Sequence, residues 1–341
     1  MFEKRKILFI CGSLNQTSML HQISQYFPEY DRFFTPYYFG DVREHLTKIF
    51  FNNTILGGKY KKLTMEYLEK NQCAIDIYGL NNKYSFIFTC QDIIIQTNIK
   101  DKMIFLVQEG MTDPEKIGYL LVKKLGFPRY IAGSSVTGLS HAYELFFVAS
   151  QGYKELFIHK GVKPEKIRVT GIPNFDFVDQ YRDNPFPYKH YVLAATSNLR
   201  ESLEYENRKK FILKARKIAQ NNNKQLLFKL HPSEKAERAT REINKYAPEA
   251  MVFPEGNTNH MISNCDILVT RYSSVVYTAL ALGKEVHADI PLETLNRLIP
   301  IQNKGTSAKS IAEITKAYLD KKDKEFRIYH QNFRYRSYQE S

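Results

Sequence analysis

The chain has 341 residues, of which 43% are hydrophobic and 25% charged, and its formal net charge is +13. This length and apolar content suffice for two hydrophobic cores of ordinary size and indicate a globular protein. The charge calls for an anionic partner, and since no RNA-binding or DNA-binding motif accompanies it, we expect phosphorylated substrates or an anionic membrane surface and no nucleic acid.

The first half of the chain alternates predicted strands with predicted helices. We expect strands at residues 6–13, 32–40, 74–80, 85–92 and 102–110, helices at 16–27 and in the region up to about residue 71, and a closing strand and turn at 166–176. Buried strands separated by helices indicate a parallel sheet covered on both faces. Residues 184–190 carry two prolines among polar residues and are interpreted as a linker.

The same alternation starts again after the linker. Strands are expected at 191–197, 225–232, 250–256, 265–270 and 284–289, and helices at 201–221, 233–246, 257–264 and 274–283. The sequence thus predicts an α/β protein of two Rossmann-like domains that face each other across a cleft, the expected ligand site. The predicted boundaries are 1–183 for the first domain, 184–190 for the linker and 191–320 for the second domain.

The last residues, 321–341, form a basic and aromatic segment. It holds six Lys or Arg residues against three acids, interleaved with five aromatic residues. Two interpretations stay open: a terminal helix packed on the body, or a peripheral contact with an anionic membrane.

Other features bear on cellular location and metal content. No apolar run approaches the about 20 residues of a spanning helix, and the first residues lead into a strand in place of a secretory signal. Cys11, Cys73, Cys90 and Cys265 lie in or beside apolar runs without a Cys-x-x-Cys pair. We therefore expect a cytoplasmic protein, with association at the inner face of the cytoplasmic membrane as an open alternative. We also expect reduced thiols, no metal and no cofactor.

Three predicted strand ends in the second domain carry groups suited to an anion. They hold Thr196, Ser197 and Asn198; Lys229, His231 and Ser233; and Arg271, Ser273 and Ser274. Each turn precedes a predicted helix, whose free N–H groups and dipole favour a phosphate. Any one hydroxyl here is explained equally well as a helix cap. The phosphate-site hypothesis depends on all three turns meeting at one edge of the sheet.

These motifs resemble those of a known group of enzymes. His231-Pro232, followed about 40 residues later by Ser273-Ser274 and then by the segment GKEV, resembles the nucleotide-binding half of GT-B glycosyltransferases that use cytidine-activated donors, including bacterial sialyltransferases and β-Kdo transferases. The segment VTGIPNFD, residues 169–176, also resembles the Gly-x-Pro-x-x-Asp segment of CDP-glycerol glycerophosphotransferases. The resemblance covers about residues 105–290 and implies the GT-B fold.

One departure separates these relatives. The glycerophosphotransferases share a His-Gly-Thr segment where this chain has VQEGMTDPE, residues 107–115, which is closer to the β-Kdo transferases. That resemblance implies that Glu109 and Asp176 flank the sugar as acid/base and nucleophile, as in retaining glycoside chemistry. A solvated loop acid is the alternative for Glu109, and a turn or helix cap is the alternative for Asp176.

The remaining candidate residues are assigned to the donor and the acceptor. We expect His231 and Lys229 to stabilise the departing phosphate, with Arg271, Ser273 and Ser274 holding it. The donor-binding set is Thr196, Ser197, Asn198, Lys229, Glu255, Gly256, Asn257, Arg271, Ser273 and Ser274, with Glu255 to Asn257 reading the base or ribose. Gly12, Ser13 and Asn15 are expected on the acceptor side.

The sequence therefore predicts a glycosyltransferase that moves a sugar acid, Kdo, from a CMP-activated donor to a cell-surface polysaccharide or glycolipid acceptor. No Asp-x-Asp motif lies near the predicted cleft, so we expect it to work without metal. Retention by double displacement and inversion both stay open. The alternatives are transfer of glycerol phosphate from CDP-glycerol, transfer of sialic acid, and a non-enzymatic protein that binds anionic glycans or nucleic acid.

Overall fold

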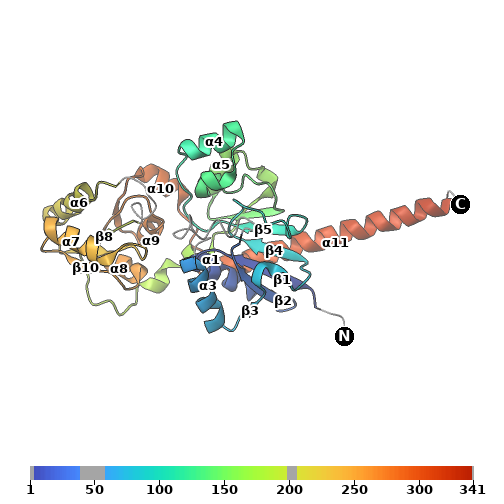
Figure 1. The fold of residues 1–341 in the computed structure, drawn as a ribbon, viewed down its shortest axis with the longest axis horizontal. Helices are drawn as coiled ribbons and strands as arrows, with labels where there is room; N and C mark the ends of the chain where they lie inside the picture. Colours follow the sequence, from blue (N-terminus) through green and yellow to red (C-terminus); the bar gives the residue numbers. More distant parts are fainter. Residues whose placement is uncertain (1–3, 39–57, 198–205, 340–341) are drawn as a thin grey trace.

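The computed structural model describes residues 4–38, 58–197 and 206–339 of the chain. Here the chain forms two α/β domains side by side, and a long C-terminal helix extends from the first (Figure 1). Asn198 lies outside the described residues, as do parts of the helices predicted before residue 71 and from residue 201.

The first domain is built on a seven-stranded parallel sheet. Its order is β3-β2-β1-β4-β5-β6-β7. Because the order changes direction between β1 and β4, the ends of these strands lie at a switch point, where open parallel sheets bind ligands. The strands are β1 (Lys6–Cys11), β2 (Asp31–Pro36), β3 (Ala74–Ile75), β4 (Phe86–Thr89), β5 (Met103–Val107), β6 (Leu145–Val148) and β7 (Ile167–Val169), and the helices are α1 (Leu14–Ser24), α3 (Gly58–Lys70), α4 (Ile117–Leu125) and α5 (Gln151–Lys160).

The second domain repeats this plan with five parallel strands. Their order is β10-β9-β8-β11-β12, with the change of direction between β8 and β11. The strands are β8 (Val192–Ala195), β9 (Leu226–Lys229), β10 (Met251–Phe253), β11 (Ile267–Val269) and β12 (Glu285–His287), and the helices are α6 (Arg208–Asn221), α7 (Ala236–Tyr246), α8 (Thr258–Asn264), α9 (Val275–Ala281) and α10 (Leu292–Leu298).

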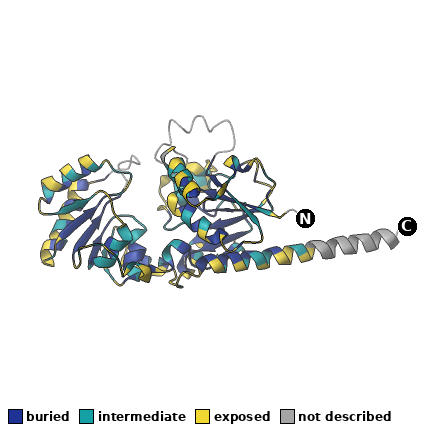
Figure 2. Ribbon diagram, turned by 90° about the horizontal axis from the view of Figure 1, so that it is seen from below, coloured by how far each residue is buried: buried dark blue, intermediate teal, exposed yellow. Residues whose placement is uncertain are grey.

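Buried apolar strands account for both sheets, as the sequence predicts. Every residue of β4, β6, β8 and β9 is buried, which fits strands covered by helices on both faces (Figure 2). Phe9 of β1 stacks on Phe34 and Phe88 of the neighbouring strands, with ring centroids 5.0 and 5.4 Å apart. Cross-strand aromatic pairs of this kind help to fix the register of the first sheet.

Several elements of the first domain differ from the sequence prediction. The strand expected at 74–80 ends at Ile75, because the Asp76 carboxylate accepts hydrogen bonds from Asn81, Asn82 and Tyr84 and folds the chain into a loop. No element was predicted at 145–160, where the structure has β6 and α5. Ser150 caps α5 by accepting from the Tyr153 N–H at 3.3 Å.

The domain boundary predicted at residue 320 is wrong. Residues 299–306 cross back to the first domain, and helix α11 (Ser307–Gln339) packs there against α1 and the sheet. Its buried residues 308, 311, 312, 315 and 319 form one helical stripe, and this stripe packs against the core of the first domain. Lys316 also pairs with Glu29 at 2.7 Å. The basic segment predicted from 321 continues α11 to Gln339, but side chains beyond 325 lie outside the description.

All four cysteines are free thiols in the structure, and Cys11, Cys90 and Cys265 are buried. Burial raises the pKa of Cys265 to about 12. Within the described residues, no helix has a stretch both long and apolar enough to cross a bilayer.

Candidate active site

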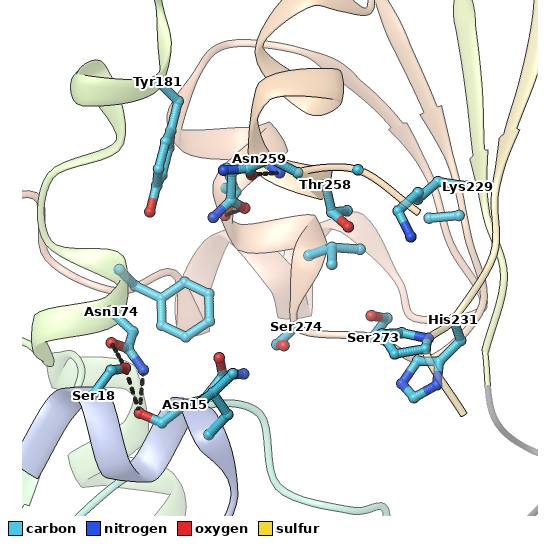
Figure 3. A pocket seen from close by; sticks show the side chains of 18 of the residues that line it. Asn15, Ser18, Asn174, Tyr181, Lys229, His231, Thr258, Asn259, Ser273 and Ser274 are labelled. Atoms are coloured by element: carbon cyan, nitrogen blue, oxygen red, sulfur yellow. Dashed lines mark hydrogen bonds between the residues drawn. The ribbon is translucent and has the colours of Figure 1, made fainter. Parts of the chain in front are cut away.

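A cavity of about 910 Å³ lies between the two domains. The first domain contributes the start of α1 and the turns around Asn174 and Tyr181, and the second contributes the ends of β8 and β9 and the starts of α8 and α9. Figure 3 shows side chains from both domains around this space. The expected residues that line it are Asn15, Thr196, Lys229, His231, Gly256, Asn257, Ser273 and Ser274.

The chemical character of this cavity is polar and cationic. Its lining includes hydroxyl, amide, imidazole and ammonium groups, and no Asp or Glu occurs among the described residues that line it. Such a surface suits an anionic or polyhydroxylated ligand, since neither is repelled and both find hydrogen-bond donors. No group of three or more His, Cys, Asp or Glu side chains that could hold a metal occurs in the described part of the chain.

His231 follows β9 and has a defined ring orientation. Its Nδ1 accepts a hydrogen bond from the Ser233 N–H at 3.1 Å. A neutral ring that accepts at Nδ1 carries its proton at Nε2. His231 can therefore donate a hydrogen bond from Nε2, as expected for a contact with phosphate.

A buried carboxylate that the sequence analysis missed holds the loop of His231. Glu234 accepts hydrogen bonds from the Thr196 hydroxyl and from the His231 N–H, the latter at 3.1 Å, and it also pairs with the buried guanidinium of Arg208. The Thr196 hydroxyl in turn accepts from the His231 N–H at 2.9 Å. These contacts join β8, α6 and the loop after β9, so the position of His231 depends on three elements.

Lys229 is nearly buried at the end of β9, with 4% of its surface exposed. Its Nζ donates to the carbonyl oxygens of Leu230 and Pro254, at 2.8 and 3.1 Å. Burial lowers the pKa of Lys229, while the nearby carboxylates of Glu255 and Glu234 act in the opposite direction. Its ammonium thus has two of three donors engaged, and it contributes charge to the cavity from a fixed position.

The turn after β11 places its serines and its arginine differently. Ser273 and Ser274 line the cavity beside His231 (Figure 3). Arg271 is not among the residues of the lining, because its Nε donates to Asp289 at 2.8 Å. In this side-chain arrangement Arg271 is therefore not placed to contact a phosphate in the cavity, contrary to the sequence prediction.

The loop after β10 supplies one side of the cavity. Gly256 and Asn257 line it, and the Asn257 side chain caps α8 by accepting from the N–H of Asn259 at 2.9 Å. Glu255 lies instead at an adjoining cavity of about 460 Å³, together with Lys229 and His231. Ser197 is buried and lies outside the lining.

On the acceptor side, Asn15 is the only one of the three expected residues in the lining. Asn174 donates to its carbonyl oxygen at 2.8 Å, which ties the start of α1 to the turn after β7. Gly12 and Ser13 lie behind the lining, where Ser13 caps α1 by accepting from the Gln16 N–H at 3.2 Å.

Glu109 lies behind the same edge of the cavity. Its carboxylate accepts from the Ser13 hydroxyl at 2.6 Å and from the Gln16 amide at 2.5 Å. Burial raises the pKa of Glu109, and these two donors offset part of that shift. It is not a solvated loop acid, yet it does not line the cavity either. The next residue, Gly110, lies so close to Phe175 and Ser274 that an added Cβ would contact both.

The expected position of Asp176 is wrong. Its side chain is 2% exposed and accepts from the Ser307 N–H at 2.9 Å, at the first turn of α11. Its backbone carbonyl accepts from the Lys304 N–H at the same distance. Asp176 therefore caps a helix, as its alternative interpretation held, and points away from the cavity because the returning chain offers it free N–H groups.

Several cavity residues had no sequence signal of their own. Figure 3 labels Ser18, Asn174, Tyr181, Thr258 and Asn259 among them, and Thr278 also belongs to the lining. Asn174 lies within the motif segment 169–176, and Asn259 follows the expected donor-binding residue Asn257 by two positions. Proximity along the chain to expected site residues was therefore their one sequence signal.

Comparison with known proteins gives the fold. No family model and no curated protein sequence matches the chain. A putative UDP-N-acetylglucosamine 2-epimerase from Listeria monocytogenes is similar in structure, with a TM-score of 0.63, 14% identity, and coverage of 95% of this chain and 98% of that one. The UDP-GlcNAc 2-epimerase from Neisseria meningitidis, bound to UDP-GlcNAc, has a TM-score of 0.57, 12% identity, and coverage of 92% and 100%.

A third similar structure is that of the Wall Teichoic Acid Polymerase TagF. Its TM-score is 0.54 at 11% identity, and the match covers 94% of this chain and 90% of that one. At these identities the likeness concerns the fold alone. Two parallel sheets, each covered by helices and meeting at a shared cavity, agree with all three neighbours, and the chain has the GT-B fold.

Proposed function

We propose that the chain is a glycosyltransferase that moves a sugar acid, Kdo, from a CMP-activated donor to a cell-surface polysaccharide or glycolipid acceptor. One observation carries this proposal: the interdomain cavity of a GT-B fold is lined by His231, Lys229 and serine hydroxyls, with no carboxylate among its described lining residues. A donor with both a phosphate and a sugar carboxylate suits that lining. The choice of Kdo rests on the resemblance of the His-Pro and Ser-Ser motifs.

The cation and hydroxyl groups act on the leaving group. When the bond between the anomeric carbon and the phosphate oxygen breaks, its electron pair stays on CMP. The Nε2–H of His231, the Lys229 ammonium and the hydroxyls of Ser273 and Ser274 stabilise that negative charge in the cavity. These protein groups replace the divalent metal that many nucleotide-sugar enzymes use, so the reaction proceeds without one.

The acceptor enters from the side of α1. Its hydroxyl oxygen attacks the anomeric carbon, and Glu109 accepts its proton after a small movement of the Ser13 and Gln16 side chains that hold it. With Asp176 committed to α11, Glu109 is the one of the two expected catalytic carboxylates that lies near this edge. We therefore favour a single displacement with inversion over double displacement.

A second candidate, transfer of glycerol phosphate from CDP-glycerol, is favoured by one observation. The fold neighbour TagF is a wall teichoic acid polymerase, and one of its structures was soaked with CDPG. An acceptor hydroxyl would then attack phosphorus, and CMP would again leave. The same cavity groups would serve both reactions, so the donor itself decides between them. Sialic acid transfer from its CMP donor remains the third possibility.

The experiment is a donor panel. Purified protein is incubated with CMP-Kdo, CMP-sialic acid, CDP-glycerol or UDP-GlcNAc, and release of nucleotide is measured with and without glycolipid acceptors. We expect release of CMP from CMP-Kdo above the spontaneous rate. Release from CDP-glycerol alone would establish the second candidate, and epimerisation of UDP-GlcNAc would make the chain an epimerase. No turnover of any donor, with binding retained, would support a non-enzymatic binding protein.

His231→Ala tests the phosphate site within this assay. We expect turnover to fall by roughly 10²-fold or more, the scale of losing one preorganised donor to developing charge. His21→Ala is the matched control, since His21 lies on α1 and contacts the Tyr67 hydroxyl away from the cavity. Near-normal turnover of the His231 variant would remove this residue from the mechanism.

A further inference from the structure

Helix α4 and the turn after it carry an unusual outer surface. Six of the fourteen large hydrophobic side chains that are exposed among the described residues fall between residues 117 and 131, with Ile117 75% and Leu125 66% exposed. The six are Ile117, Leu120, Leu125, Phe127, Tyr130 and Ile131. We call the exposed side chains of residues 116–131 the α4 surface.

The orientation of α4 explains this exposure. Tyr119 is the one buried residue of the helix, and its hydroxyl accepts from the Lys123 ammonium at 3.1 Å. Ile117, Leu120 and Leu125 lie on the opposite side, where they meet solvent. A helix of a globular protein normally turns its apolar side chains inward, so this one presents an apolar face to something outside the domain.

The charge of the α4 surface indicates what that partner is. Residues 116–131 contain four cations, Lys116, Lys123, Lys124 and Arg129, and no acid. Apolar side chains surrounded by cations are typical of helices that lie in the interface of an anionic bilayer. A protein partner with an apolar face would not require this one-sided charge.

A cavity of about 390 Å³ beside α4 adds a place for a phosphate headgroup. It is lined by Lys123, Arg129 and Lys160 together with Val122, Phe127 and Leu139. The Arg129 Nε is buried, and it has no hydrogen-bond partner within the described ranges 4–38, 58–197 and 206–339. A buried guanidinium N–H without an acceptor, at a cavity with apolar walls, fits the phosphate of a lipid whose chains continue into the bilayer.

The α4 surface is also connected to the interdomain cavity. The loop between β5 and α4 contains Glu109, and its Thr112 carbonyl accepts from the Tyr272 hydroxyl of the second domain at 2.7 Å. Figure 1 shows α4 at the outer edge of the first domain, next to α5. Only a few residues therefore separate this outer face from the proposed acceptor edge.

We propose that the α4 surface docks the protein on an anionic lipid bilayer. The exposed apolar side chains enter the interface, the lysines contact lipid phosphates, and a headgroup occupies the cavity at Arg129. This docking goes beyond the transfer reaction and does not depend on which donor the enzyme uses.

The test uses the full chain and sedimentation with vesicles. We expect binding to vesicles of phosphatidylglycerol mixed with phosphatidylcholine, weaker binding to phosphatidylcholine alone, and loss of binding at high salt. Leu125→Glu should lower the affinity for the mixed vesicles by at least about tenfold, because it removes apolar contact and adds a repelled charge. Leu80→Glu is the matched control, since Leu80 is exposed to the same degree, 67%, and lies outside the α4 surface.

Each other outcome would overturn the proposal. Equal binding of Leu125→Glu and wild type would assign any membrane contact to another part of the chain, such as the basic C-terminal segment. No binding to mixed vesicles, together with a dimer in solution that Leu125→Glu dissociates, would identify a second copy as the partner. Release of CMP from a soluble assay should stay unchanged in Leu125→Glu, which separates docking from the transfer reaction.

Discussion

Asp176 and Glu109 are carboxylates of the first domain that occupy similar positions in the sequence but accept hydrogen bonds from different kinds of donor. Both follow strands and precede turns, but Asp176 accepts from the first N–H of α11, whereas Glu109 accepts from two side chains of the segment that opens α1. Burial raises the pKa of each. The contact of Asp176 with a helix start is structural, whereas our proposal that Glu109 exchanges a proton rests on its being held by side chains near the cavity.

Asp176→Asn should leave transfer nearly unchanged. Asparagine keeps an oxygen that accepts from the Ser307 N–H and is itself a good cap. Since the pKa of Asp176 is raised on folding, its ionisation opposes folding at neutral pH, and the neutral amide avoids that cost. We therefore expect the melting temperature of Asp176→Asn at pH 7 to stay within a few degrees of wild type.

Asp176→Ala is the companion variant. It leaves the Ser307 N–H without its acceptor and should lose about 1 kcal/mol of stability or more. Folded Asp176→Asn protein that binds CMP but transfers nothing would restore the nucleophile and double displacement.

Ser13→Ala should change the pH dependence of transfer. The Ser13 hydroxyl donates to the Glu109 carboxylate and so favours its charged form. Removing it raises the pKa of Glu109 further, and a base that must be ionised then loses activity at a higher pH. In the profile of kcat/KM against pH, the acid limb of Ser13→Ala should shift to higher pH. An unmoved limb with normal activity would show that Glu109 is not the base.

At the scale of elements, the loop after β9 depends on contacts that no local pattern reveals. Glu234 joins Thr196 of the segment after β8 to Arg208 of α6, and both contacts cross more than 20 positions of sequence. The ion pair of Glu234 and Arg208 is almost fully buried. Breaking such a pair costs more than its formation gains, so it fixes this loop in one arrangement.

Thr196→Val tests this connection. Valine has a similar size but removes the hydroxyl that donates to Glu234 and accepts from the His231 N–H. We expect a stability loss of about 1–3 kcal/mol and, by calorimetric titration, roughly tenfold weaker binding of CMP, because the His231 loop loses its anchor.

Thr315→Val is the control for burial alone. Thr315 is also buried, and its hydroxyl donates to the Ile311 carbonyl within α11. If both variants bind CMP as wild type does, the Thr196 contact has no part in positioning His231.

At the scale of the whole molecule, two chain crossings and several side-chain contacts join the domains. The Tyr153 and Tyr277 hydroxyls are 2.7 Å apart, and the Ile301 N–H donates to the Ala149 carbonyl at 3.0 Å. Gly152 approaches the Arg297 carbonyl so closely that a Cβ would clash with it. These contacts join the two domains through residues that do not themselves line the cavity.

The proposed metal independence concerns the assembled cavity as a whole. We expect transfer to survive excess EDTA, since cations of the protein serve in place of a metal ion. Added Mg²⁺ or Mn²⁺ should change the rate by no more than about twofold after EDTA is removed. Strict dependence on either ion in the CMP-release assay would contradict the proposed chemistry.

The sequence by itself determined the two α/β domains, nearly all of their strands, and the three turns that bear Thr196, His231 and Ser273. These depend on local hydrophobic periodicity and on the rule that parallel strands end at one edge, both of which can be read along the chain. It also predicted apolar surroundings for the cysteines, and Cys11, Cys90 and Cys265 are buried.

Only the tertiary structure decided the rest. Helix α11 returns to the first domain, and Asp176 caps it. Asp289 accepts a hydrogen bond from Arg271, and Glu234 contacts Thr196 and Arg208. Each of these is a polar contact between residues distant in sequence, and a buried polar group takes whichever partner the packing brings within about 3 Å. The orientation of α4, with its apolar side chains outward, is likewise fixed by which face the domain core covers.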